Sequence, residues 1–299
     1  MVGSILTFKA YSGAVALIKR VTKRELIRMV RALAMQTHRE IDEAGLEPDD
    51  FKGIAQKYGI TLSWAALPND NPGCYIKKER KIIFNPHVQN RERLNFTFYH
   101  ELMHDRIEHD DELLSLLADA YIMSYDTIVE RLCNAGAAEL LIPSTDMQEM
   151  IRQYGFSTQI IPELCDRYNA SSIAVAFHMI FTATHKCYLV IAEPDYVMPD
   201  KLPMLADTKP VEAQLKLIMS YTAASPSAEY SIRRGQIVSS DHPIFTAWEQ
   251  KDKIACRARI PFSTGKVWEV DFDALYFKSK IFAVFNESYP SSSDQMQLL

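Results

Sequence analysis

The sequence has few cysteines, and none has a spacing that would give it a structural role. There are five, an odd number without a CxxC pair: Cys74, Cys133, Cys165, Cys187 and Cys256. The sequence therefore indicates neither a disulfide framework nor a zinc ribbon. Reduced thiols in a cytosolic protein are the simplest interpretation.

Long apolar runs and internal repeats are also missing. The most apolar stretch, residues 173–183, is too short to span a bilayer and contains His178. Near the N-terminus Lys9 comes early and only residues 14–18 are continuously apolar, which is not the pattern of a secretory signal. No fixed period is visible. We therefore expect a soluble, cytoplasmic protein that has no membrane segment.

A strong excess of positive charge is absent as well. The net charge is −5, which argues against a protein built mainly to coat nucleic acid. Hydrophobic residues make up 47% and charged residues 24%, so wholesale disorder is excluded. At roughly 100–200 residues per domain, a chain of 299 residues predicts two or three domains.

Hydrophobic periodicity and turn residues divide the chain into an α+β first part, a small helical middle and a strand-rich end. In the first part we expect helices over 21–44, 49–58, 91–108, 112–125 and 127–141, and strands over 60–67, 74–77 and 81–84. In the middle we expect helices over 144–154, 158–168 and 170–182. In the last part we expect strands over 187–192, 227–231, 255–261, 267–272 and 280–285.

The sharpest chemical signal is the run His100-Glu101-Leu102-Met103-His104. Residues four apart on a helix lie on one face, so His100 and His104 can offer two imidazoles to a single ion. Glu101 lies beside them and can accept a proton from a water at the metal. This is the logic of the HExxH metallopeptidase site, although two ordinary histidines on a helix give the same pattern.

A zinc site of this kind needs a third protein ligand. The spacing with Gly and His at fixed later positions fails here, because His109 is one residue out of register. The acidic candidates downstream are Glu108, Asp110, Asp111, Glu112, Asp119, Asp126 and Glu130. Glu130 is favoured because it heads an apolar helical run with small residues, where an unpaired carboxylate is costly. Asn134, one turn later, could orient it. A surface carboxylate remains the alternative.

The same residues resemble the ImmA/IrrE metallopeptidases. The resemblance rests on Arg93-x-x-Phe96-Thr97-x-x-His100-Glu101-x-x-His104, on Glu130-x-x-x-Asn134 with residues 140–143, and on the run 82–85. Residues 129–143 and 241–243 resemble the IrrE radiation-response branch in particular. The similarity extends over about residues 24–287.

This resemblance implies an α+β multidomain chain in three parts. A gluzincin-like zinc peptidase domain would span 1–143, a helix-turn-helix-like domain 144–184, and a GAF-like α/β sensor domain 185–287, before a flexible tail at 288–299. It implies that His100, His104 and Glu130 bind zinc, or manganese, and that Glu101 is the catalytic base. The implied activity is cleavage of a helix-turn-helix repressor, which releases stress or DNA-repair genes.

The sequence departs from the family in the catalytic segment. Tyr99 and Met103 stand where the family often has Ala and Gly, and their bulk is expected to reshape the cleft beside the metal. Asp105-Arg106 replaces an apolar pair common in the family. Because neither departure touches a ligand, both bear on substrate preference rather than on metal binding.

Two other functions fit parts of the sequence. One is a DNA-binding regulator with a structural metal, and the other is a ligand sensor whose peptidase site is vestigial. Direct DNA binding is disfavoured because residues 144–184 offer only Arg152 and Arg167 against four acidic residues, Asp146, Glu149, Glu163 and Asp166. The C-terminal part has no defined ligand motif, so its signal or small-molecule ligand stays open.

Overall fold

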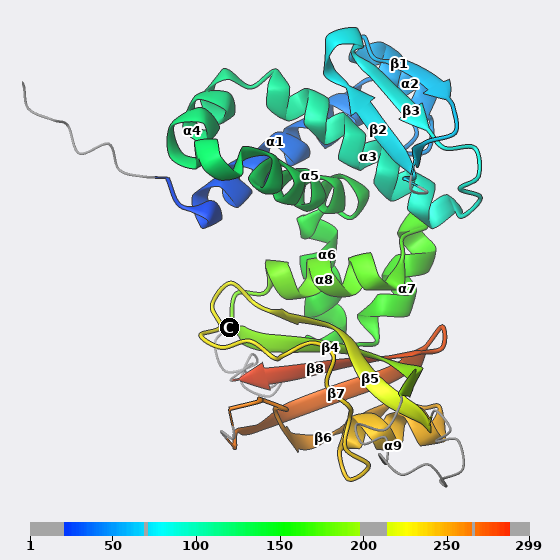
Figure 1. Cartoon of the computed structure of the whole chain (residues 1–299), viewed down its shortest axis with the longest axis vertical. Coiled ribbons are helices and arrows are strands. Elements are labelled where there is room, and N and C mark those ends of the chain that lie inside the picture. Colours follow the sequence, from blue (N-terminus) through cyan, green and yellow to red (C-terminus); the bar gives the residue numbers. More distant parts are fainter. Residues whose placement is uncertain (1–20, 69–70, 198–213, 265–266, 288–299) are drawn as a thin grey trace, which may run out of the picture.

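The computed structural model describes residues 21–68, 71–197, 214–264 and 267–287, without the side chains of residues 119, 120 and 122. In Figure 1, with the longest axis vertical, one end holds helices around a small sheet and the other holds a larger sheet. Three short helices lie between the two ends. The expected tail at 288–299 lies outside the described residues.

The N-terminal end begins with two capped helices. Helix α1, Lys23–Glu43, starts with a capping box in which Thr22 and Glu25 satisfy each other's backbone N–H groups. Helix α2, Phe51–Lys57, is capped by Asp50, which accepts from the Gly53 backbone N–H. The strands that follow are β1 (Thr61–Trp64), β2 (Gly73–Ile76) and β3 (Lys81–Phe84).

The small sheet has the order β1-β3-β2, so β2 is an edge strand. The strands expected over 74–77 and 81–84 are present as β2 and β3. They pair antiparallel as a hairpin, and its tip is the short 3₁₀ helix η2, Lys77–Glu79. β1 pairs parallel with β3.

Three helices complete this end of the molecule: α3 (Arg91–Glu108), α4 (Asp111–Tyr121) and α5 (Tyr125–Leu141), with the 3₁₀ turn η3 (Ile122–Ser124) between the last two. Asn90 caps α3 by accepting from the Arg93 backbone N–H. Helices α3 and α5 pack closely, because a Cβ at Gly136 of α5 would lie 2.7 Å from Met103 Cε of α3. A residue without a side chain is what allows this approach.

The middle helices are α6 (Ser144–Tyr154), α7 (Ile160–Tyr168) and α8 (Ser172–Thr182). Asn169 ends α7 in a left-handed conformation, and Ser171 caps α8. The sequence predicted all three elements, with the bounds of α6 correct to the residue.

The C-terminal part is a five-stranded antiparallel sheet in the order β5-β4-β8-β7-β6. Its strands are β4 (Lys186–Val197), β5 (Gln214–Ala224), β6 (Ile254–Arg259), β7 (Glu269–Phe277) and β8 (Lys280–Glu287). Helix α9, Pro243–Gln250, packs against β6, β7 and β8. In Figure 1 it lies on the far side of the sheet from α6–α8.

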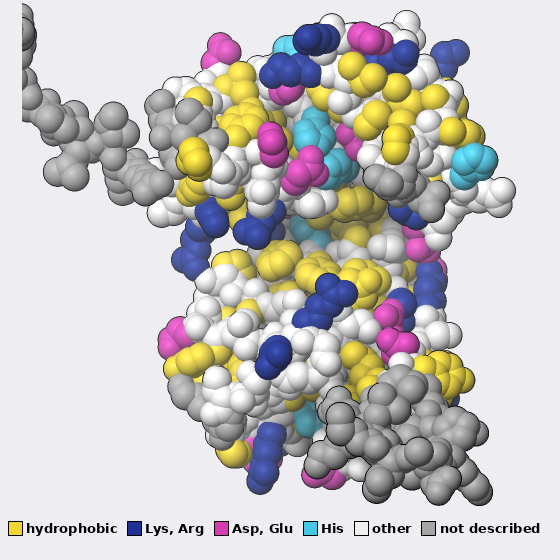
Figure 2. All heavy atoms as spheres, in the orientation of Figure 1, with side chains coloured by type: hydrophobic (Ala, Val, Ile, Leu, Met, Phe, Trp, Pro, Cys, Tyr) yellow, Lys and Arg dark blue, Asp and Glu magenta, His cyan; other side chains and the backbone are white. Residues whose placement is uncertain are grey.

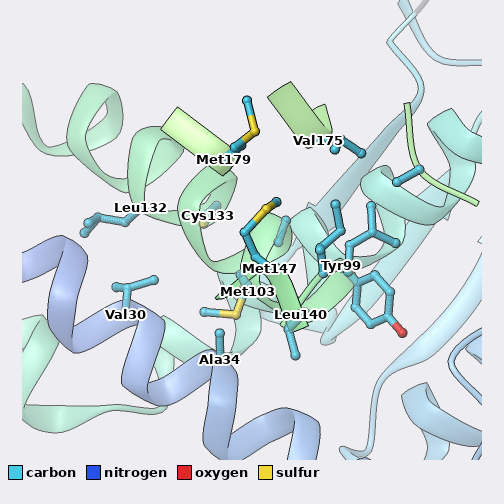
Figure 3. Close-up of a cluster of buried hydrophobic side chains, with 14 of the residues drawn as sticks. Val30, Ala34, Tyr99, Met103, Leu132, Cys133, Leu140, Met147, Val175 and Met179 are labelled. Carbon is cyan, nitrogen blue, oxygen red and sulfur yellow. The ribbon is translucent and has the colours of Figure 1, made fainter. Parts of the chain in front are cut away.

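Two hydrophobic cores hold the chain together. The first joins α1, α3, α5 and the middle helices, and reaches one face of the C-terminal sheet through residues such as Leu189 and Phe282. Figure 3 shows part of it, with side chains from helices α1, α3, α5, α6 and α8 meeting. The second core lies between the other sheet face and α9. The middle helices therefore share one core with both ends.

One expected strand in the C-terminal part is wrong, and two elements there were not predicted. Residues 227–231 form no strand, because Ser225–Ala228 close a turn in which the Ala228 N–H donates to the Ser225 carbonyl. Strand β5 was not predicted, although Leu215, Leu217, Met219 and Tyr221 alternate along it at the strand period. Helix α9 was not predicted either. His242 is its N-cap, followed by a proline at the first position.

Within the described residues, no helix is both long enough and apolar enough to cross a membrane.

Candidate metal centre

Helix α3 presents His100 and His104 on one face, one turn apart, as the spacing predicts. Their Nε2 atoms lie 3.3 Å from each other, so both rings point at the same position. The two side chains are only 14% and 19% exposed. Figure 2 shows histidine and acidic side chains side by side on one face of the upper half of the molecule.

Glu130, in the second turn of α5, completes a three-residue cluster. Its Oε2 lies 3.2 Å from His100 Nε2, and its Oε1 lies 3.4 Å from His104 Nε2. Within the described part of the chain, these are the three side chains grouped closely enough to hold a metal ion, with ligand atoms within 4.8 Å of one another. The Glu130 side chain is 57% exposed, so the expectation that burial makes an unpaired carboxylate costly here is wrong.

Asn134 lies one turn after Glu130, but it contacts His100 rather than Glu130. Its Oδ1 is 3.1 Å from His100 Nδ1, which can donate to it. A proton on Nδ1 leaves the lone pair of His100 on Nε2, the atom that faces Glu130. Asn134 therefore orients His100 rather than Glu130.

Burial keeps both imidazoles neutral. It lowers the pKa of His100, against raising contributions from Glu130 and Asn134. Burial, followed by the charge of His100, lowers the pKa of His104 to about 4. Neutral imidazoles and a carboxylate are the donors of a His₂Glu site, so the residues present fit a divalent transition metal.

Glu101 lies beside the cluster and is only 7% exposed. Burial, followed by the charge of Glu130, raises the pKa of its carboxyl to about 7. A hydrogen bond donated by the Tyr75 backbone N–H acts in the opposite direction. The side chain next to the first histidine is thus a buried carboxyl group that lies beside the edge strand β2.

The other acidic candidates have different roles or lie elsewhere. Glu108 pairs with Lys77 at 2.9 Å. Asp110 accepts from the Leu113 backbone N–H and caps α4. Asp126 is exposed in the first turn of α5. The side chain of Asp119 lies outside the described residues.

The two bulky residues in the motif do not reshape the cleft. Met103 is fully buried and faces Gly136 in the core, as Figure 3 shows in part. Tyr99 is 3% exposed, and its hydroxyl donates to the Pro48 carbonyl. The expectation that these residues narrow the site is therefore wrong, because both side chains are buried in packing contacts and line no open surface.

Comparison with known proteins agrees with this geometry. Residues 55–179 match the IrrE N-terminal-like domain, peptidase family M78. The chain is 28% identical over 229 residues to the radiation response metalloprotease IrrE of Deinococcus deserti, covering 76% of this chain and 78% of that protein. Residues 55–179 thus carry a domain of the IrrE N-terminal-like kind, and the similarity over most of the chain is to the IrrE branch of the ImmA/IrrE metallopeptidases.

Two further matches extend the likeness. The radiation response metalloprotease IrrE of Deinococcus radiodurans is 25% identical over 240 residues, which are 80% of this chain and 70% of that protein. A solved Mycobacterium tuberculosis transcriptional regulator superposes with a TM-score of 0.53 over 88% of this chain and 79% of its own, at 15% identity. Because the identity to the Mycobacterium tuberculosis protein is so low, that match is evidence of a similar fold only.

Sequence reasoning missed one part of the site. Tyr75 of β2 lies with its ring parallel to that of His104, with centroids 6.5 Å apart and an interplanar angle of 9°. Its hydroxyl donates to Asp105. No local pattern could have found this contact, because it depends on how the hairpin packs on α3.

Proposed function

We propose that the chain is an intracellular metallopeptidase of the gluzincin type, with His100, His104 and Glu130 as the metal ligands. The convergence of these three side chains within 4.8 Å carries the proposal. Zinc is the metal that a His₂Glu set favours, and manganese is the alternative. When bound, such an ion polarises the scissile carbonyl and makes a water molecule more acidic.

In this proposal Glu101 is the general base. It takes a proton from the attacking water and later delivers that proton to the leaving amine. Its buried carboxyl, held by the Tyr75 N–H, supports this role. Asn134 holds the Nδ1 proton of His100 so that Nε2 stays free for the ion.

The proposed substrate is a helix-turn-helix transcriptional repressor, whose cleavage would release stress or DNA-repair genes. The two relatives are named as radiation response metalloproteases, which supports a protein substrate and a stress role. In Figure 2 the surface is hollowed below the histidine and acidic side chains, and hydrophobic side chains line the hollow.

We assign residues 1–143 to the peptidase domain, 144–184 to a helix-turn-helix-like domain and 185–287 to a GAF-like sensor domain for an unidentified ligand. The middle domain is not proposed to bind DNA. Both of its arginines are engaged within the segment, Arg152 with Glu149 and Arg167 with Asp146. The five cysteines are free, which agrees with a cytoplasmic location.

The test is incubation of the purified chain with a candidate repressor, with and without a chelator. We expect cleavage at one position that the chelator abolishes. A Glu101→Gln variant should retain bound metal, measured by elemental analysis, and lose cleavage by about 10²–10⁴-fold. Glu108→Gln is the matched control, because Glu108 lies on the same helix but pairs with Lys77.

Two outcomes contradict the proposal. Cleavage by Glu101→Gln at the wild-type rate would refute the mechanism. Gently purified protein that takes up neither zinc nor manganese would refute the metallopeptidase itself. Tight, sequence-dependent DNA binding in a gel shift at moderate salt would favour the DNA-binding regulator instead.

A further inference from the structure

Helix α3 has a second functional face beside the histidine face. Glu101, Asp105 and Glu108 follow one another at helical spacing, and all three contact the β2–β3 hairpin. Glu101 accepts from the Tyr75 backbone N–H, Asp105 from the Tyr75 hydroxyl, and Glu108 pairs with Lys77. The catalytic segment is thus bound along its length to the edge strand of the small sheet and its turn.

Asp105 is the buried member of this face, with a side chain only 1% exposed. Its Oδ1 accepts from the Tyr75 hydroxyl at 2.7 Å and from Arg80 Nε at 2.9 Å. Its Oδ2 accepts from Arg80 Nη2 at 2.9 Å. Charge-assisted, two-pronged bonds of this kind fix geometry more firmly than a single neutral hydrogen bond.

Arg80 is itself constrained. It adopts the left-handed conformation with φ of 44°, which residues other than glycine seldom take. Its Nη2 also donates to the Tyr58 carbonyl at 2.8 Å. The guanidinium therefore ties the hairpin tip to α3 and to the end of α2.

Tyr75 is the link from this network to the candidate site. Its backbone N–H binds Glu101, its ring lies parallel to His104, and its hydroxyl is fixed by Asp105. Movement of Tyr75 would therefore displace a donor to the proposed base and a neighbour of a proposed ligand together.

We propose that Asp105 is a positioning residue, which acts through Tyr75 to hold Glu101 in its reactive geometry. The inference rests on the proposed peptidase function for its catalytic consequence. The Lys77–Glu108 pair cannot serve the same purpose, because Lys77 is 66% exposed and an exposed pair holds geometry weakly.

The test compares Asp105→Asn, Tyr75→Phe and the control Lys77→Ala in the full-length chain. Asp105→Asn keeps the shape of the side chain, but its amide group places N–H donors opposite the N–H donors of Arg80. Tyr75→Phe removes only the hydroxyl and keeps the ring beside His104. Each variant is measured by kcat and KM on the cleaved repressor, by zinc content, and by amide hydrogen exchange of Tyr75 in metal-free protein.

We expect Asp105→Asn to lower kcat by about 10–100-fold, with KM and zinc content near wild type. Tyr75→Phe should produce a smaller loss in the same direction. Tyr75 amide exchange should rise about tenfold or more in both variants, because the bond to Glu101 opens more often. Lys77→Ala should match the wild type in all three measurements.

If the role of Asp105 is purely structural, Asp105→Asn will lower the stability of the protein. The kcat per folded, metal-loaded molecule and the amide exchange of Tyr75 will then stay unchanged. That result would overturn the proposal. If Asp105→Asn fails to fold, Tyr75→Phe decides by the same criteria. If the wild type cleaves no repressor, the peptidase proposal fails, and Tyr75 exchange alone then decides whether Asp105 positions the hairpin.

Discussion

The two ends of the molecule bury different kinds of side chain. Around α3, the N-terminal end buries or half-buries His100, Glu101, His104 and Asp105, and each has a charged or polar partner. The central strands of the C-terminal sheet bury mostly apolar residues on both faces. Along β8, Phe282 faces the first core and Phe285 the second.

The N-terminal end thus holds a cluster of ionisable side chains, whereas the C-terminal sheet holds a mainly apolar core. Buried ionisable groups reduce stability unless they are paired. A cluster of them beside one helix is therefore typical of a functional site. One face of the C-terminal sheet instead packs on the middle helices, whose core continues into the N-terminal helices. The two ends are therefore joined by packing, and four experiments test how far their roles are separate.

The largest effect is expected from the matched pair Phe282→Ala and Phe285→Ala. Both side chains are fully buried, three residues apart on one strand, and each truncation should reduce the free energy of unfolding by about 3–5 kcal/mol. Urea unfolding measures this loss. Hydrogen exchange should rise in α8 for Phe282→Ala and in α9 for Phe285→Ala. Equal loosening of α8 by both variants would contradict two separate cores.

A second experiment acts on the N-terminal end alone. Gly136→Val would place a Cβ 2.7 Å from Met103 Cε and push α5 away from α3. Overpacking of this kind costs about 1–3 kcal/mol. Since Glu130 lies on α5, zinc affinity should fall as well, measured by competition with a chromophoric chelator.

The double variant Gly136→Val with Met103→Ala provides the control. Removing the methionine side chain opens the space that the valine needs, so zinc affinity should recover even if some stability is lost. Unchanged zinc affinity in Gly136→Val alone would show that the close approach of the two helices does not set the cluster.

The third experiment concerns a buried histidine at the junction of the helices. His178 of α8 is 2% exposed, and its Nε2 lies 4.0 Å from Glu139 Oε2 of α5. Burial, followed by the charge of Arg31, lowers the pKa of His178 to about 3. The unfolded chain, with a histidine pKa of about 6.5, therefore binds more protons between these two values.

This difference in bound protons sets how the free energy of unfolding changes with pH. The stability contributed by neutral His178 is complete above about pH 6.5 and is lost as the pH falls through that window, with a slope of at most about 1.4 kcal/mol per pH unit. In His178→Gln, the free energy of unfolding should change less between about pH 7 and about pH 5 than in the wild type. Parallel curves for the two proteins would show that His178 is not responsible.

The smallest effect is expected at the one ionic contact described between the β7–β8 turn and α3. Lys278 Nζ lies 2.7 Å from Glu92 Oε1, with side chains 45% and 25% exposed. Lys278→Ala should cost about 0.2–1 kcal/mol, less at high salt. A double-mutant cycle with Glu92→Gln measures the pair itself. A coupling well above that range would show that this contact, as well as the shared core, joins the two ends.

Much of the local structure could be predicted from the sequence. Residues 91–108 and 144–154 are helices with the expected bounds, because capping residues and apolar periodicity are local signals. The strands of the β2–β3 hairpin were expected over 74–77 and 81–84, close to their observed bounds. Strand β5 and helix α9 were not predicted, although apolar residues alternate along β5 and a proline marks the start of α9.

The candidate site, too, could be predicted only in part from the sequence. Spacing alone places His100 and His104 on one face of a helix and Glu101 beside them. The sequence also favoured Glu130, but with a wrong physical reason, since the side chain is 57% exposed. Asn134 was noticed and given the wrong partner.

The sequence by itself thus determined which residues share a helix face, because the helical repeat fixes the neighbours of every side chain. Only the tertiary structure decided what each face of α3 meets. Gly136 lets α5 bring Glu130 to the histidines, Met103 turns into the core, and Tyr75 with Asp105 binds the hairpin to the other face. These contacts join residues tens of positions apart, and their energies depend on how whole elements pack rather than on any local pattern.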